Sequence, residues 1–222
     1  MTEPPFSDIP ARNIEKRGRG RPSRTQAAEL SDALIEAALQ SFRLNGYAAT
    51  TMDDIAAACG AAKHSIYRRF PSKEALFTAA VALERERMLV HIHSIGVKQS
   101  DPLSSLRDMC RSLLDVIVAP GSVDLYRMCI AEASRFPIIA SEFAQTRESI
   151  TDVLEPHVVT AQKCRLLAVT DPREFAKQLE SFVIGQVLHT VLLHRDLRPS
   201  DETLDRHFDS TWRIVMFGAL PR

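Results

Sequence analysis

Apolar side chains recur every three or four residues along most of the chain, the spacing typical of helices with one buried face. The first such run begins near Glu29 and places Leu34, Ala38 and Phe42 on one side. It is predicted to end at Asn45-Gly46, because a glycine there can adopt the left-handed conformation that stops a helix.

Two short helices are predicted next. The first spans residues 52–58, because Thr50 and Thr51 offer hydroxyl caps and two acidic residues follow in its first turn. Cys59-Gly60 breaks it, and the second short helix covers about residues 62–69 before Phe70-Pro71.

Longer helices fill the remainder. Ser72 is placed to cap one over residues 73–93, and five more are predicted over residues 102–118, 123–135, 138–158, 171–194 and 202–218. Prolines at 102, 137 and 172 lie at helix starts, where a missing N–H costs nothing. No run has the strict alternation of a strand, so the sequence predicts an all-α fold of nine helices in two parts.

Charge is divided unevenly along the 222 residues. Lys and Arg total 28 and Asp and Glu total 28, yet residues 12–73 hold eleven basic against six acidic residues, a net charge of +5. The rest of the chain is then −5, which indicates that one end alone meets a polyanion. Apolar residues at 45% and charged residues at 25% are ordinary for a globular protein.

Several classes of protein are disfavoured. The longest mostly apolar stretch, residues 182–193, is too short to cross a membrane, and the N-terminus lacks a secretory signal, so we expect a cytoplasmic protein. The four cysteines include no C-x-x-C pair and no cluster of metal ligands, so we expect free thiols, no metal site and no cofactor.

The two short helices and the Gly-containing turn between them have the arrangement of a helix-turn-helix. Ile55, Ala56, Ile66 and Phe70 fall on the inward sides. The exposed face of the second helix then carries Lys63, His64, Tyr67 and Arg68, which can donate to phosphates or base edges. The alternative is a solvated basic face on which Tyr67 is half-buried by packing.

The stretches ATTMDDIAAACG (residues 49–60) and SIYRRFPSKEAL (residues 65–76) resemble the DNA-binding signature of the tetracycline-repressor (TetR) family. The resemblance covers about residues 28–78. It implies a homodimer whose N-terminal module binds double-stranded operator DNA and whose C-terminal helical domain binds a small molecule that releases the DNA.

The resemblance also implies roles for individual residues. By position, the phosphate contacts are Thr50 or Thr51, Tyr67 and Lys73, and the residues that contact bases are Lys63, His64 and Ser65. A phosphate at the N-terminus of a helix also suits the sign of the helix dipole.

The segment before the first helix is basic. Residues 17–22 (RGRGRP) are similar to an AT-hook, in which Arg19 and Arg21 would enter an A·T-rich minor groove. A disordered basic tail that raises affinity without choosing a sequence is the alternative.

The C-terminal half supplies candidates for an apolar ligand cavity, although core packing is the favoured explanation for any single one of them. They are Met109, Leu113, Ile117, Met128, Phe143, Phe175 and Phe182. Residues 125–137 resemble a stretch frequent in one TetR subgroup, but the identity of a ligand does not transfer between such domains.

Gly185 lies within a predicted helix, where alanine would be more stable by about 1 kcal/mol, so a second helix is expected to cross closely there. The TetR resemblance implies an intersubunit four-helix bundle from the last two helices. The dimer candidates are Gly185, His189, Phe208 and Trp212, and burial within one subunit is the alternative.

These observations predict a basic flexible arm over residues 1–27, a helix-turn-helix domain over residues 28–75 and a ligand-binding and dimerisation domain over residues 76–222. We expect a homodimeric repressor released from a palindromic operator by a small, largely apolar effector. An architectural DNA-binding protein without an effector is the alternative, and an enzyme is disfavoured because no catalytic motif is present.

Overall fold

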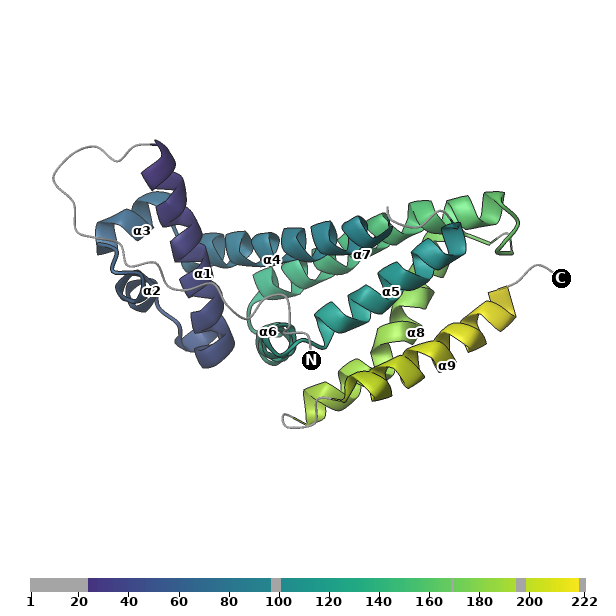
Figure 1. Ribbon diagram of the computed structural model, residues 1–222. Coiled ribbons are helices and arrows are strands. Elements are labelled where there is room, and N and C mark those ends of the chain that lie inside the picture. Colours follow the sequence, from purple (N-terminus) through teal and green to yellow (C-terminus); the bar gives the residue numbers. More distant parts are fainter. Residues whose placement is uncertain (1–23, 97–100, 169, 195–198, 220–222) are drawn as a thin grey trace. The chain divides into compact units, whose positions relative to one another are not determined.

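The computed structural model describes residues 24–96, 101–168, 170–194 and 199–219, and these form nine helices with no strand (Figure 1). The helices are α1 (Arg24–Ala49), α2 (Met52–Ala58), α3 (Lys63–Arg69), α4 (Lys73–Gly96), α5 (Pro102–Ile117), α6 (Pro120–Glu132), α7 (Pro137–Lys163), α8 (Pro172–Leu193) and α9 (Asp201–Ala219). The predicted all-α fold is confirmed.

The predicted break at Gly46 is present, because the backbone there leaves the helical conformation at a positive φ (φ 79°, ψ 166°), and a short helical stretch up to Ala49 follows the kink. α7 ends at Lys163 instead of residue 158, because the buried Val158 and Ala161 extend its inward stripe beyond the exposed Pro156. α1 also begins earlier than expected, at Arg24, and α6 begins at Pro120.

Contacts within the chain divide it into two units that meet between Val81 and Ala82, within α4. In the first unit, α2 packs against both α1 and α3 (Figure 1). Its centre is an aromatic trio in which the ring centroids of Phe42, Tyr47 and Phe77 lie 5.1–5.5 Å apart. All three side chains are buried, and they fix α1 and the start of α4 as one support.

The second unit has its own core. α7 and α8 pack together, and each also packs on α5 and α6. Met88 and Ile92 of α4 join this core, as do Leu204 and Phe208 of α9. The unit therefore buries one continuous apolar cluster.

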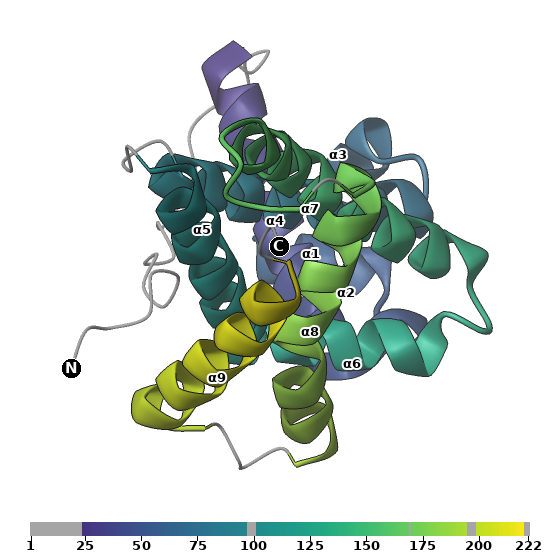
Figure 2. The same ribbon diagram turned by 90° about the vertical axis from the view of Figure 1, so that its right-hand side faces the viewer.

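α9 lies alongside α5 and α8 (Figure 2). Charged pairs join it to α5: the guanidinium of Arg107 is 2.6 Å from Asp209, and that of Arg111 is 2.7 Å from Asp205. Both guanidinium groups also lie over the ring of Phe208. Burial of Leu204, Phe208 and Trp212 determines which face of α9 is inward, and these charged contacts lie at its edge.

Candidate nucleic-acid interface

The turn between α2 and α3 is a Schellman motif. Gly60 takes a left-handed conformation (φ 63°), its N–H donates to the carbonyl of Ala57, and the N–H of Ala61 donates to the carbonyl of Ala56. Ile66, fully buried, anchors α3 from below. The predicted helix-turn-helix arrangement is therefore present in the structure.

The opposite face of α3 is open to solvent. Lys63, His64 and Arg68 are exposed, and Tyr67 is 44% exposed. Tyr67 is therefore about half-buried, which agrees with both interpretations of this face, the DNA-contacting one and the solvated one. Ser65, also expected to contact bases, is half-buried beside this face.

Lys63 forms an ion pair across the motif. Its Nζ donates to Oδ2 of Asp53, in the first turn of α2, at 2.5 Å. This hydrogen bond and the carboxylate charge raise the pKa of Lys63. The lysine therefore keeps its positive charge at the surface of α3.

Thr51 is the N-cap of α2. Its hydroxyl accepts a hydrogen bond from the N–H of Asp54 (3.1 Å) and donates to the Asp54 carboxylate (2.6 Å). The side chain is exposed, so Thr51 remains available to the proposed DNA surface.

The structure corrects the expectation for Thr50. Its side chain is 2% exposed, and its hydroxyl donates to the carbonyls of Ser41 (3.1 Å) and Gly46 (2.7 Å). Thr50 therefore ties the kinked end of α1 to the start of α2 and cannot reach a phosphate from this position.

Lys73 also differs from the expectation. Its half-buried ammonium donates to the carbonyls of Tyr47 (2.8 Å), Ala48 (3.2 Å) and Thr50 (3.0 Å), and it lies 4.5 Å from the centre of the Tyr47 ring. All three donors of the ammonium are occupied within the protein. Lys73 therefore stabilises the end of α1, and in this structure its three donors are directed to carbonyls of the protein.

Arg19 and Arg21 of the AT-hook-like segment lie outside the described residues. The AT-hook and the basic tail both remain possible interpretations of that segment.

Most of the predicted cavity residues of the second unit are core residues instead. Met109 and Leu113 belong to the buried core cluster, Ile117 packs against it, and Met128 is buried as well. Phe143 makes an edge-to-face contact with Tyr126, with ring centroids 4.7 Å apart. The apolar periodicity was sufficient to place these side chains inward, but not to distinguish a filled core from a cavity.

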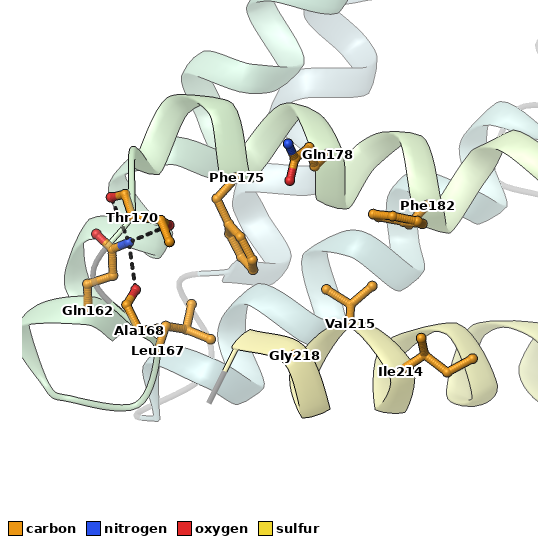
Figure 3. Close-up of a pocket in the computed structure, with 10 residues that line it drawn as sticks. All are labelled: Gln162, Leu167, Ala168, Thr170, Phe175, Gln178, Phe182, Ile214, Val215 and Gly218. Atoms are coloured by element: carbon orange, nitrogen blue, oxygen red, sulfur yellow. Dashed lines mark hydrogen bonds between the residues drawn. The ribbon is translucent and has the colours of Figure 1, made fainter. Parts of the chain in front are cut away.

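Phe175 and Phe182 do line a pocket, of about 350 Å³ (Figure 3). Phe175 points from α8 toward α9, where Val215 and Ile214 form the opposite wall. Gln178 adds an amide beside them, whereas the amide of Gln162 is held by hydrogen bonds to Ala168 and Thr170. The pocket is therefore mostly apolar, with polar groups at its margin.

The four dimer candidates separate into two pairs. Phe208 (1% exposed) and Trp212 (8%) point into the core of their own subunit, so for these two the intrasubunit alternative is correct. Gly185 and His189 are exposed, and a Cβ added at Gly185 would meet no atom within 4 Å. No neighbour within the described part of the subunit explains this glycine.

Sequence reasoning missed the exposed apolar side chains of α8 and α9. Phe182 is 59% exposed, Ile214 71% and Phe217 89%. The signal was present, because Ile214 and Phe217 lie on the side of α9 away from Leu204, Phe208 and Trp212. Such a row on adjacent helices is typical of an interaction surface.

Buried charges were also missed. Glu180 of α8 is 6% exposed and accepts from Arg147 of α7 at 3.4 Å, and burial raises the pKa of its carboxyl. Arg85 of α4 pairs with the buried Glu142 of α7 at 3.3 Å. The position of Glu180 between Ala176 and Ile184 on the inward stripe could have indicated its burial.

The described residues also bear on metal binding and on membrane insertion. They contain no group of three or more His, Cys, Asp or Glu side chains able to hold a metal ion. None of the helices in the described ranges is long and apolar enough to span a bilayer.

Two short helices pack inward through Ile55 and Ile66, and the second of them exposes a basic and aromatic face. This arrangement defines a DNA-binding protein of the helix-turn-helix class. The family model "Bacterial regulatory proteins, tetR family" matches residues 34–80, and "AefR-like transcriptional repressor, C-terminal domain" matches residues 104–217. The chain belongs to the TetR family. It is a DNA-binding transcriptional regulator of a non-enzymatic family.

The similarity to known proteins extends over nearly the whole chain. The HTH-type transcriptional regulator RutR of Escherichia coli O157:H7 is 27% identical over 220 residues, which cover 91% of this chain and 96% of RutR. The structure of the flavonoid-responsive regulator FrrA is 28% identical, covers 88% of this chain and 99% of its own, and has a TM-score of 0.71. A TetR-family regulator from Mesorhizobium loti MAFF303099 superposes with a TM-score of 0.80 at 23% identity, covering 90% and 100% of the two chains.

Proposed function

We propose that this regulator is a homodimeric repressor that a small, largely apolar effector releases from a near-palindromic operator. The observation that carries the proposal is the exposed face of α3, where Lys63, His64, Tyr67 and Arg68 project above the buried Ile66. A helix that displays donors in this way can enter the major groove.

In the proposed complex, Lys63 and His64 contact base edges at the start of α3, with Ser65 beside them. Tyr67 and Arg68, one turn further along, bind phosphates, as does the exposed Thr51 at the start of α2. The basic arm, residues 1–27, adds contacts through Arg19 and Arg21.

Dimerisation is supported by the exposed apolar row on α8 and α9, formed by Phe182, Ile214 and Phe217, together with the open position at Gly185. A single helix-turn-helix module buries only about 600–1,000 Å² on DNA, which is small for specific binding near 10⁻⁸ M. Two modules related by a two-fold axis double this area, and the DNA site must then be nearly palindromic.

An apolar effector is supported by the pocket between α8 and α9. Its volume of about 350 Å³ and its walls of Phe175, Phe182 and Val215 suit an aromatic or aliphatic molecule, with Gln178 available to orient a polar group. One relative, FrrA, is described as flavonoid-responsive, which favours the same chemical class.

The pocket also adjoins the proposed dimer surface, since Phe182 and Ile214 belong to both. An effector bound there can therefore alter how two subunits meet. Shifting a 1:99 equilibrium to 99:1 requires a preference of about 5.5 kcal/mol for the released state. Burying about 200 Å² of apolar ligand surface supplies about 5 kcal/mol, which is close to the requirement when the burial is specific to that state.

The test begins with selection of duplexes from a random pool by the full-length protein, which we expect to yield a near-palindromic site. Calorimetry with candidate apolar compounds, with and without this duplex, then measures linkage. An effector that releases the DNA must bind more weakly when the operator is present, by the same factor by which it weakens DNA binding. Selection of an asymmetric site, or release only by a metal or an ionic metabolite, would contradict the proposal.

A further inference from the structure

The ion pair between Asp53 and Lys63 places a carboxylate within the surface that we propose to meet DNA. It joins the first turn of α2 to the first residue of α3, with Nζ and Oδ2 2.5 Å apart and both side chains exposed. A carboxylate at such a surface repels phosphates, so its presence there needs an explanation.

Stabilisation of the start of α3 explains part of the presence of Asp53. Lys63 begins α3, which has no side-chain N-cap and no acidic residue in its first turn, so the lysine lies at the positive end of the helix dipole. Asp53 compensates that unfavourable placement. It also fixes the direction of the lysine side chain, because the carboxylate holds one of the three ammonium donors and leaves two for other acceptors.

We propose, on the basis of the function proposed above, that Asp53 is a positioning residue for specificity. While paired, Lys63 can offer its two remaining donors to a base edge in the operator. On any other sequence the partner is a phosphate that lies away from the direction in which Asp53 holds the side chain, so Lys63 leaves Asp53 to reach it. Asp53 therefore weakens binding to non-operator DNA more than binding to the operator.

The expected size follows from the exposure of the pair. Exposed ion pairs contribute little, so the change should be about two- to fivefold in non-operator affinity. A lysine freed to bind one phosphate should also steepen the slope of log affinity against log salt by up to about 0.9.

The experiment compares full-length wild type with Asp53→Asn on two duplexes, the selected operator and a scrambled duplex of equal composition, across a salt titration. We expect Asp53→Asn to bind the scrambled duplex two- to fivefold more tightly with a steeper salt slope, and to gain less on the operator. Asp53→Glu, which can keep the ion pair, should restore wild-type behaviour. Asp32→Asn, an exposed carboxylate of α1, is the control for lost charge.

Introducing Asp53→Asn into the Lys63→Ala variant tests whether Asp53 acts through Lys63. If Asp53 acts through Lys63, Asp53→Asn should change nothing there. An equal gain in that background, or a gain matched by Asp32→Asn, would mean simple charge repulsion and would overturn the inference. If Lys63→Ala weakens operator binding while Asp53→Asn has no effect on either duplex, the inference fails and the proposed function stands. If Lys63→Ala binds as wild type and no duplex is preferred, both fail.

Discussion

Lys73 and Lys63 occupy the first positions of α4 and α3, and their ammonium groups have different surroundings. Lys73 donates to three carbonyls at the end of α1, whereas Lys63 is exposed and pairs only with Asp53 among the described contacts. Loss of Lys73 leaves those carbonyls without their charged donor. Loss of Lys63 affects only the exposed Asp53 carboxylate, which water can solvate.

We therefore expect Lys73→Met to lower the free energy of unfolding by about 1.5–3 kcal/mol, the usual contribution of hydrogen bonds to a charged donor. Lys63→Met, the matched control, should leave stability within about 0.5 kcal/mol of wild type and should weaken operator binding instead. Urea denaturation of both variants measures the difference. Equal stabilities would show that the carbonyls find water as a sufficient substitute.

The sequence predicted the exposed residues of α3 correctly, because the apolar Ile66 and Phe70, four residues apart, define an inward side without any tertiary information. It could not separate Thr50 from Thr51. Either hydroxyl can cap a helix, and the choice depends on carbonyls of Ser41 and Gly46 that only the folded α1 brings near Thr50.

At the scale of elements, α9 shows what periodicity cannot decide. Its apolar residues form two groups on different sides, with Phe208 and Trp212 packed inward and Phe217 exposed. The pattern identifies apolar positions but not the neighbour that covers each of them. The side with Phe208 and Trp212 joins the apolar core of the unit, and Arg107 and Arg111 of α5 lie over the Phe208 ring.

The exposed side of α9 leads to a prediction about assembly. Phe217→Glu places a charge in the proposed dimer surface without touching the core, so we expect a monomer in sedimentation at micromolar concentration and at least tenfold weaker operator binding. Ile130→Glu, at an exposed apolar residue of α6, is the control and should remain dimeric. A Phe217→Glu protein that sediments as wild type would remove this surface from the interface.

α3 lacks a local signal that favours a helix, and α7 contains a residue that disfavours one. α3 is only seven residues long, with no side-chain cap, and depends on packing through Ile66. α7 contains Pro156 and still runs to Lys163, because buried residues on either side of the proline keep it packed. In both helices tertiary contact outweighs local preference. The predicted bounds of α3 agree with the structure to within one residue, whereas α7 ends five residues beyond its predicted end at residue 158.

At the scale of the whole molecule, the division of charge agrees with the division of structure. The basic stretch, residues 12–73, includes the helix-turn-helix, and the acidic remainder includes the unit with the pocket and the exposed apolar row. Attraction to DNA is thereby confined to one unit. The charge division follows from the sequence alone. Apolar spacing predicted burial for the candidate cavity residues, but it could not show which of them line a pocket, because that depends on how α8 and α9 meet.

The central claim is that α3 recognises operator DNA. Its most direct test is equilibrium binding of wild type and the triple variant Lys63→Ala, His64→Ala and Tyr67→Ala to the selected operator at one fixed salt concentration. With the two base contacts contributing about 1–3 kcal/mol each, and the phosphate contact of Tyr67 also lost, the variant should bind at least about thirtyfold more weakly while its thermal unfolding is unchanged. A triple variant that binds the operator with wild-type affinity would contradict the assignment of α3 to the major groove.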